Sequence, residues 1–222
     1  MLDFLIELLL VAPTVLIALT FHECAHGYIA YKLGDPTAKY LGRLSLNPIK
    51  HIDPLGAICM LIAHFGWAKP VPIDITNFKN PKRDVALSAL AGPVANILLG
   101  FIGCLIYSVT INLLPAFYEK TFGYYIAYVW VNFIYYFGWL NISLAIFNLL
   151  PIPPLDGSKI LYAFLPPKAY NGFKRHEREI ALVFMLIIIL DSRFLGGYVT
   201  GFLSYIVGLI HGGFVNLFNL LF

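Results

Sequence analysis

Three ionisable residues at helical spacing interrupt an apolar stretch near the N-terminus. His22, Glu23 and His26 form an HExxH pattern inside Phe21–Gly27. Residues four apart on a helix face the same way, so both imidazoles can reach one zinc ion. A glutamate beside the first ligand is placed to accept a proton from a zinc-activated water. The pattern indicates a hydrolytic zinc centre, against the simpler interpretation of two histidines that only pack between helices.

A catalytic zinc site needs a third protein ligand, and Asp156 is the best placed acid. It follows the proline-dense loop Pro151–Leu155 and precedes Gly157, which permits a sharp turn. Irregular backbone at membrane depth persists only where it lines a cavity or is buried in protein. Asn148, eight residues earlier, has an amide that can hold a substrate carbonyl or a developing oxyanion. We predict that the metal ligands are His22, His26 and Asp156 and that the catalytic groups are Glu23 and Asn148.

The elements that must position these groups are membrane helices. The 222-residue chain is 59% hydrophobic and 12% charged, whereas soluble domains are about half apolar and about a quarter charged. We predict an all-α polytopic membrane protein with about five transmembrane helices. It forms a single domain, 1–222, with a core at about 4–165 and additional C-terminal helices at about 179–222. The expected spans are 4–33, 85–114, 124–149, 180–190 and 198–222, of which the fourth is short.

The stretch between the first two spans is not expected to cross the bilayer. Its apolar run, 55–65, is about half the length that a spanning helix needs, and the following 66–74 is rich in proline. We predict a short membrane re-entrant β-hairpin whose free edge lies around Trp67 to Ile73. Because Pro70 and Pro72 lack N–H groups, the residues that donate to an unwound substrate strand would be Lys69, Val71 and Ile73.

Basic residues indicate the orientation, because they are retained on the cytoplasmic side during insertion. The formal net charge of +3 is small and lies in loops, which favours this interpretation over a nucleic-acid partner. Thirteen of the fifteen lysines and arginines lie inside if the first span runs inward, and only Lys120 and Arg193 lie outside. The motif then lies about 10 to 16 Å from the cytoplasmic end of its helix. We expect a multi-pass protein of the cell membrane with an active site that is accessible from the cytoplasm.

The combined motifs resemble the site-2 protease family of zinc intramembrane metalloproteases. The HExxH at His22–His26 is followed far downstream by Asn148-Leu149-Leu150-Pro151-Ile152-Pro153-Pro154-Leu155-Asp156-Gly157. Further stretches are similar to the short prokaryotic branch without a PDZ domain: Gly34–Ala38, Gly42–Pro48, Gly66–Pro72 and Ala91–Asn96. The resemblance covers about residues 15–160. It implies that both histidines and the aspartate bind Zn²⁺, that Glu23 is the acid and base, and that Asn148 lies at the active site.

The resemblance also bears on residues that are ambiguous on their own. It implies that Asn96 contacts substrate, although Gly92, Pro93 and Asn96 could equally only kink and pack a helix. His51 and His64 flank the predicted re-entrant segment and are candidates for an accessory catalytic role, or else are loop histidines. Members of the family carry a membrane-embedded β-hairpin near the active site, so the candidate substrate-binding set is Asn96, Trp67, Val71 and Ile73.

The expected function is zinc-dependent hydrolysis of peptide bonds in or next to transmembrane segments of other membrane proteins. The expected partners are such a segment and the lipid bilayer, and no nucleic acid. Two other classes remain open. A metal-transporting membrane protein also buries histidine and aspartate, but it needs no base beside its ligands and usually shows inverted repeats. A catalytically silent scaffold of the same fold would be expected to lose Glu23 or a ligand.

Overall fold

The computed structural model describes residues 2–56, 68–113, 122–193 and 197–221. These residues form helices and connecting segments, and no strand occurs among them. The helices are α1 (Leu2–Leu33), α2 (Thr37–Tyr40), α4 (Pro81–Leu113), α5 (Phe122–Leu149), α6 (Asp156–Phe164), α7 (Pro167–Arg175), α8 (Glu177–Arg193) and α9 (Tyr198–Asn219), with 3-10 turns η1 (Pro48–His51) and η2 (Ile75–Asn77). The all-helical prediction is confirmed for this part of the chain.

Four helices in the described ranges are long and apolar enough to cross a membrane: Leu10–Leu33, Pro81–Leu113, Gly123–Leu149 and Tyr198–Asn219. The fifth predicted span, 180–190, lies in α8, which has 17 residues and begins with Glu177, Arg178 and Glu179. At 1.5 Å per residue α8 is about 26 Å long, slightly less than the roughly 30 Å hydrocarbon core of a bilayer. The described ranges thus contain four candidate spans, as a multi-pass membrane protein requires.

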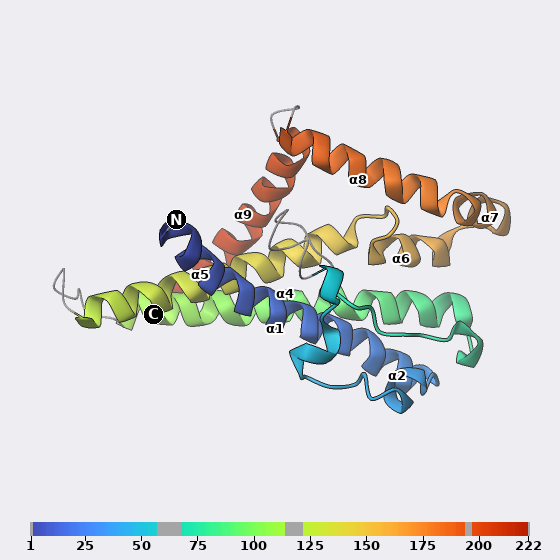
Figure 1. The fold of residues 1–222 in the computed structure, drawn as a ribbon, viewed down its shortest axis with the longest axis horizontal. Coiled ribbons are helices and arrows are strands. Elements are labelled where there is room, and N and C mark those ends of the chain that lie inside the picture. Colours follow the sequence, from blue (N-terminus) through green and yellow to red (C-terminus); the bar gives the residue numbers. More distant parts are fainter. Residues whose placement is uncertain (1, 57–67, 114–121, 194–196, 222) are drawn as a thin grey trace.

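Helix α4 is the centre of the assembly, since it packs against α1, α5, α6 and α9. Figure 1 shows α1, α4 and α5 running side by side, while α7 and α8 form a separate arm and α9 returns from it to the bundle. Glycines permit the closest contact: a Cβ at Gly103 would lie 2.8 Å from the backbone nitrogen of Gly138 on α5. Small residues of this kind let membrane helices approach closely. Beside them, α9 completes an apolar core of Cys104, Ile142, Val207 and Phe218.

The described residues between α1 and α4 are mostly irregular, apart from α2, η1 and η2. Ile52 and Ala68 form one isolated antiparallel bridge, and the Lys69 N–H donates to the His51 carbonyl at 2.9 Å. Residues 54–56 are helical. Residues 57–67, which include His64 and Trp67 of the predicted site, lie outside the described residues. This bridge lies beside the region of the predicted hairpin, and the hairpin itself stays a prediction.

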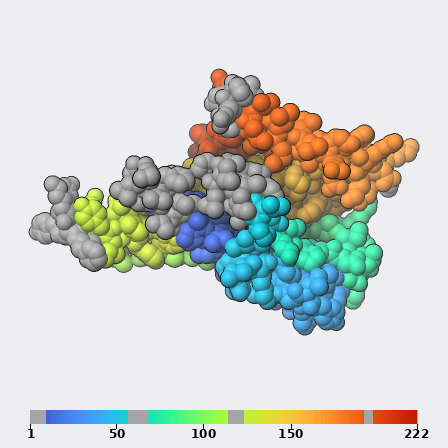
Figure 2. Space-filling model, in the orientation of Figure 1, coloured from blue at the N-terminus to red at the C-terminus, as the bar shows by residue number. Residues whose placement is uncertain are grey.

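Two groups of segments flank the end of the bundle where α4 begins. In the space-filling view, the residues between α1 and α4 (light blue to teal) lie on one side of that end, and the α7–α8 arm (orange) lies on the other (Figure 2). Helix α6 lies between the arm and α4 (Figure 1) and contacts α4 along its length. The N-terminus of α6 is thereby brought to the middle of α1.

Candidate metal centre

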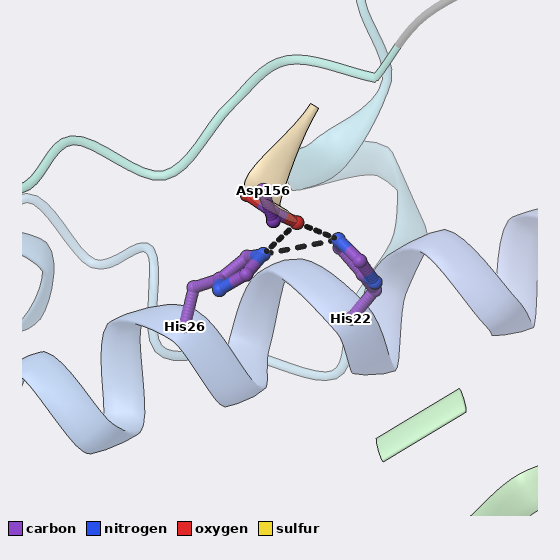
Figure 3. A group of neighbouring side chains, drawn as sticks. All are labelled: His22, His26 and Asp156. Atoms are coloured by element: carbon purple, nitrogen blue, oxygen red, sulfur yellow. Dashed lines mark hydrogen bonds and ion pairs between the residues drawn. The ribbon is translucent and has the colours of Figure 1, made fainter. Parts of the chain in front are cut away.

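Three side chains meet where α6 begins against α1. The Nε2 atoms of His22 and His26 lie 3.0 Å apart, and Oδ2 of Asp156 lies 3.0 Å from each of them (Figure 3). All three residues are buried. In the described ranges this is the one group of three or more His, Cys, Asp or Glu side chains whose ligand atoms converge closely enough to hold a metal ion.

The protons on the two imidazoles are fixed by neighbours on α4. Nδ1 of His26 lies 2.7 Å from the Ser88 carbonyl, which can only accept, so Nδ1 carries the proton. Nδ1 of His22 contacts Oδ1 of Asn96, and the Asn96 amide nitrogen donates elsewhere, to the Ala18 carbonyl at 3.1 Å and to Oδ1 of Asn141 at 3.0 Å. With both imidazoles neutral, both Nε2 atoms therefore present lone pairs to each other and to a carboxylate.

Such an arrangement fits a bound cation. Two lone pairs and a carboxylate oxygen repel one another at 3.0 Å unless a positive charge lies between them. Zinc bonds of 2.0–2.2 Å place tetrahedral ligand atoms roughly 3.3 Å apart, so a few tenths of an ångström of expansion accommodate the ion. The space is kept open by Gly92 on α4, because a Cβ there would collide with both imidazole rings. The donor set of two neutral imidazoles and one carboxylate is typical of catalytic zinc.

Asp156 is held in place by its own loop and helix. Nζ of Lys159 lies 3.0 Å from Oδ1, which leaves Oδ2 directed at the histidines. Gly157 is needed for this position, because a Cβ at residue 157 would strike the carbonyls of Leu149 and Leu150 at the end of α5. The proline-dense loop thus turns the chain so tightly that α6 starts directly against the end of α5.

Glu23 points toward a different element. Its Oε2 accepts a hydrogen bond of 2.8 Å from the backbone N–H of Val71, in the segment that precedes η2. The side chain of Val71 is buried, and its Cγ1 would lie 2.9 Å from a Cβ at Gly27, one turn further along α1. The carboxylate next to the first proposed ligand is therefore held by a single backbone donor.

Asn96 on α4 lies in the interior of the bundle, beside His22. Asn96 has no exposed surface, and its amide oxygen and nitrogen are all engaged with His22, Ala18 and Asn141. In this position Asn96 fixes the tautomer and orientation of His22, as outer-shell partners of metal-binding histidines do, and its contact with a substrate stays a prediction.

The other predicted residues are distributed around this centre. The Asn148 amide donates to the Leu144 carbonyl of its own helix at 2.9 Å, so in this structure it is not directed at the ligands. His51 is buried, with Nε2 2.7 Å from the Ser45 carbonyl, and it belongs to the loop structure after α2. Of the three N–H groups expected to pair with a substrate, those of Lys69 and Val71 already bind His51 and Glu23, which leaves Ile73.

Sequence reasoning did not identify several supporting groups. Asn141 lies in an apolar helix, and a buried amide at that depth is a signal that could have drawn attention to it. The Ser88 carbonyl and the Val71 N–H are backbone groups, which any residue type could supply, so their positions carry no sequence signal. Lys159 lies one turn after Asp156 and could have been noticed from that spacing.

Comparison with known proteins identifies the fold family. The model of peptidase family M50 matches residues 10–191. YwhC of Bacillus subtilis is 40% identical over 190 residues, which is 84% of this chain and 81% of YwhC. Rip2 of Mycolicibacterium smegmatis is 28% identical over 185 residues, which is 82% of this chain and 67% of Rip2. Both relatives carry the words zinc metalloprotease in their names. No solved structure matches the chain. The extent of these matches and the converging side chains agree: the chain belongs to peptidase family M50, the site-2 protease family of zinc metalloproteases.

Proposed function

We propose that this zinc metalloprotease hydrolyses a peptide bond in or next to a transmembrane segment of another membrane protein, and that water reaches the site from the cytoplasmic side. The observation that carries the proposal is the depth of the proposed ligands. His22 and His26 lie within the membrane-length segment Leu10–Leu33, 11 and 7 residues before its end. At 1.5 Å per residue this is about 10 to 16 Å into the bilayer.

The proposed ligands are His22, His26 and Asp156, each through the atom that faces the other two. Bound zinc polarises the scissile carbonyl and increases the acidity of a water molecule. Glu23 accepts the proton of the attacking water and returns it to the leaving amine. Oε2 of Glu23 is engaged by Val71, so Oε1 is the oxygen that carries the proton. Asn148 remains the proposed partner of the developing oxyanion, which requires its amide to leave the Leu144 carbonyl.

The substrate must be unwound before it can react, because the carbonyls of a helix are occupied by internal hydrogen bonds. The segment 68–74 is a proposed support for the unwound strand. Within the described structure no hydrogen bond engages the Val71 carbonyl or the Ile73 N–H, whereas the N–H groups of Lys69, Val71 and Asp74 are all engaged. Pairing of a substrate strand would therefore use these two groups, with Trp67 as a further proposed contact.

The experiment is a cleavage assay on the purified protein in detergent micelles. The probes are synthetic single-span peptides with about 25 apolar residues and a central Asn-Gly or Gly-Pro break, analysed by mass spectrometry. The parent should cleave near the break, a chelator should abolish cleavage and added zinc should restore it. Glu23→Gln should keep zinc and lose about a hundredfold to ten-thousandfold in turnover, because an amide cannot carry the proton. Equal turnover of Glu23→Gln and the parent would refute the mechanism, and zinc binding without any turnover would indicate a silent scaffold.

A further inference from the structure

The segment from Ala68 to Asp74, here called the crossing segment, passes over α1 beside the proposed base. It has no regular secondary structure, yet it is fixed near both ends. At the first end, the Arg43 guanidinium donates to the Lys69 carbonyl at 2.7 Å, and the Lys69 N–H donates to the His51 carbonyl at 2.9 Å. Both backbone groups of Lys69 are therefore held, one of them by a buried arginine.

The second end is held by Asp35, which has no exposed surface. Its carboxylate accepts from the Asp74 N–H at 2.8 Å, from the Asn77 amide at 2.8 Å and from the Thr37 N–H at 3.1 Å. Burial by itself raises the pKa of a carboxyl group, but these hydrogen bonds outweigh it and hold the pKa of Asp35 below its ordinary value. Asp35 thus remains ionised and joins the end of α1 to the end of the crossing segment.

Between these ends, Val71 makes contacts with two different parts of α1. Its side chain packs over Gly27, where only a hydrogen allows so close an approach. Its N–H donates to Glu23 at 2.8 Å. A hydrogen bond from a neutral amide to a carboxylate is stronger than one between neutral groups, and it fixes the orientation of the carboxylate. Because the crossing segment is fixed near both ends, its N–H is in place before any substrate arrives.

We propose that the Val71 N–H is a positioning group for Glu23, and that Arg43 and Asp35 act through the crossing segment to hold it there. The proposal rests on the proposed function, in which Glu23 is the base. It assigns different roles to the two carboxylate oxygens: Oε2 is held by the backbone, and Oε1 is left to exchange the proton. It also means that the Val71 N–H is not available to a substrate strand while Glu23 is in place.

Hydrogen exchange tests the contact without any turnover. Pro70 and Pro72 have no N–H, so the crossing segment has few exchangeable amides besides those of Lys69, Val71 and Ile73. The Glu23→Ala variant should gain about one rapidly exchanging amide in a peptide that covers this segment, relative to the parent. Unchanged exchange in that peptide would overturn the proposal, whether or not the protein cleaves any probe.

Kinetics test the role, with the single-span peptides of the cleavage assay as probes. Val71→Pro removes the N–H, and Val71→Ala shortens the side chain but keeps the N–H. A proline is tolerated best here because the residue before Pro72 is already restricted to extended backbone. We expect Val71→Pro to lose about tenfold to a hundredfold in kcat relative to Val71→Ala, with KM unchanged, since small misplacements of a catalytic group have effects of this size. Equal kcat in the two variants would overturn the proposal.

A raised KM with unchanged kcat in Val71→Pro would also overturn it, because that result means that the N–H binds substrate. Zinc content serves as the control for folding. If Val71→Pro loses zinc, Arg43→Met and Arg43→Lys are compared instead. Only the Arg43→Lys variant can still donate a hydrogen bond to the Lys69 carbonyl. The methionine variant should lose kcat, and the lysine variant should recover part of it. The proposed function fails on a different result, namely a zinc-loaded parent that cleaves no probe.

Discussion

Replacing Asn96 tests how the metal centre depends on a residue that touches no metal. In Asn96→Leu the branched shape of the side chain is kept, but the acceptor for the His22 Nδ1 proton disappears, and so do the two donations to Ala18 and Asn141. His22 then has no group that fixes its tautomer or its ring angle. Loss of such an outer partner typically weakens metal binding by about 10- to 100-fold, which is about 1.4 to 2.7 kcal/mol.

The measurement is competition for zinc between the purified protein in detergent and a chromophoric chelator. Asn132→Leu is the matched control, because it removes an asparagine amide in α5 that donates only to the Tyr128 carbonyl of its own helix, at 2.7 Å. We expect the apparent Kd of Asn96→Leu to rise by at least tenfold and that of the control to stay within about threefold of the parent. Parent-like zinc affinity in a folded Asn96→Leu protein would show that His22 does not need this support.

Three further outcomes follow from particular positions. The Gly92→Ala variant should lose zinc binding, because the added Cβ would collide with His26. The Gly212→Ala variant is the control and should bind zinc normally, because no atom lies within 4 Å of a Cβ at that position. Elemental analysis of both variants measures the zinc content. Folding lowers the pKa of Asp35, so the ionised carboxylate stabilises the folded protein fully when the pH is above the ordinary carboxyl pKa. This stabilisation is lost as the pH falls toward the pKa of Asp35 in the folded protein. Asp35→Asn should therefore melt at a lower temperature than the parent at neutral pH, and the difference should shrink in acid, as thermal unfolding curves would show; a constant difference would contradict this. A cysteine at Asn80 should resist an impermeant reagent on intact cells, and strong labelling would reverse the proposed orientation.

Much of the arrangement could be predicted because it depends on the spacing of residues along a helix and on the apolar interior of the membrane. The four-residue interval placed His22 and His26 on one helix face, and long apolar runs in a chain with few charges predicted the membrane helices. Asp156 was predicted as the third ligand because it is the acid that follows an irregular loop, and a membrane tolerates irregular backbone only where it lines a cavity or is buried in protein. The structure brings these three residues to within 3.0 Å of one another across more than 130 positions of sequence.

The remainder depended on contacts that residue types do not encode. The resemblance left Asn96 open between substrate contact and helix packing because an exposed amide and a buried one look alike in sequence, and only the packing of α4 against α1 and α5 shows that this amide is buried. Val71 was expected to donate to a substrate, but a backbone N–H has no identity of its own and takes the nearest acceptor, here Glu23. The fifth predicted span stays a prediction because α8 is short, and its charged first turn leaves fewer residues for the apolar part.

The separation of the proposed ligands along the chain has a consequence for biosynthesis. His22 and His26 are synthesised first, before the neighbours that fix the tautomers of their imidazoles. Ser88 and Asn96 arrive with α4, Asn141 arrives with α5, and Asp156 follows only after α5 is complete. A nascent chain thus carries a weak nitrogen pair in the membrane and gains the third proposed ligand only after α1, α4 and α5 have been synthesised, before α9 completes the bundle. Hydrolytic competence is in this way delayed until the helices that enclose the site have been inserted.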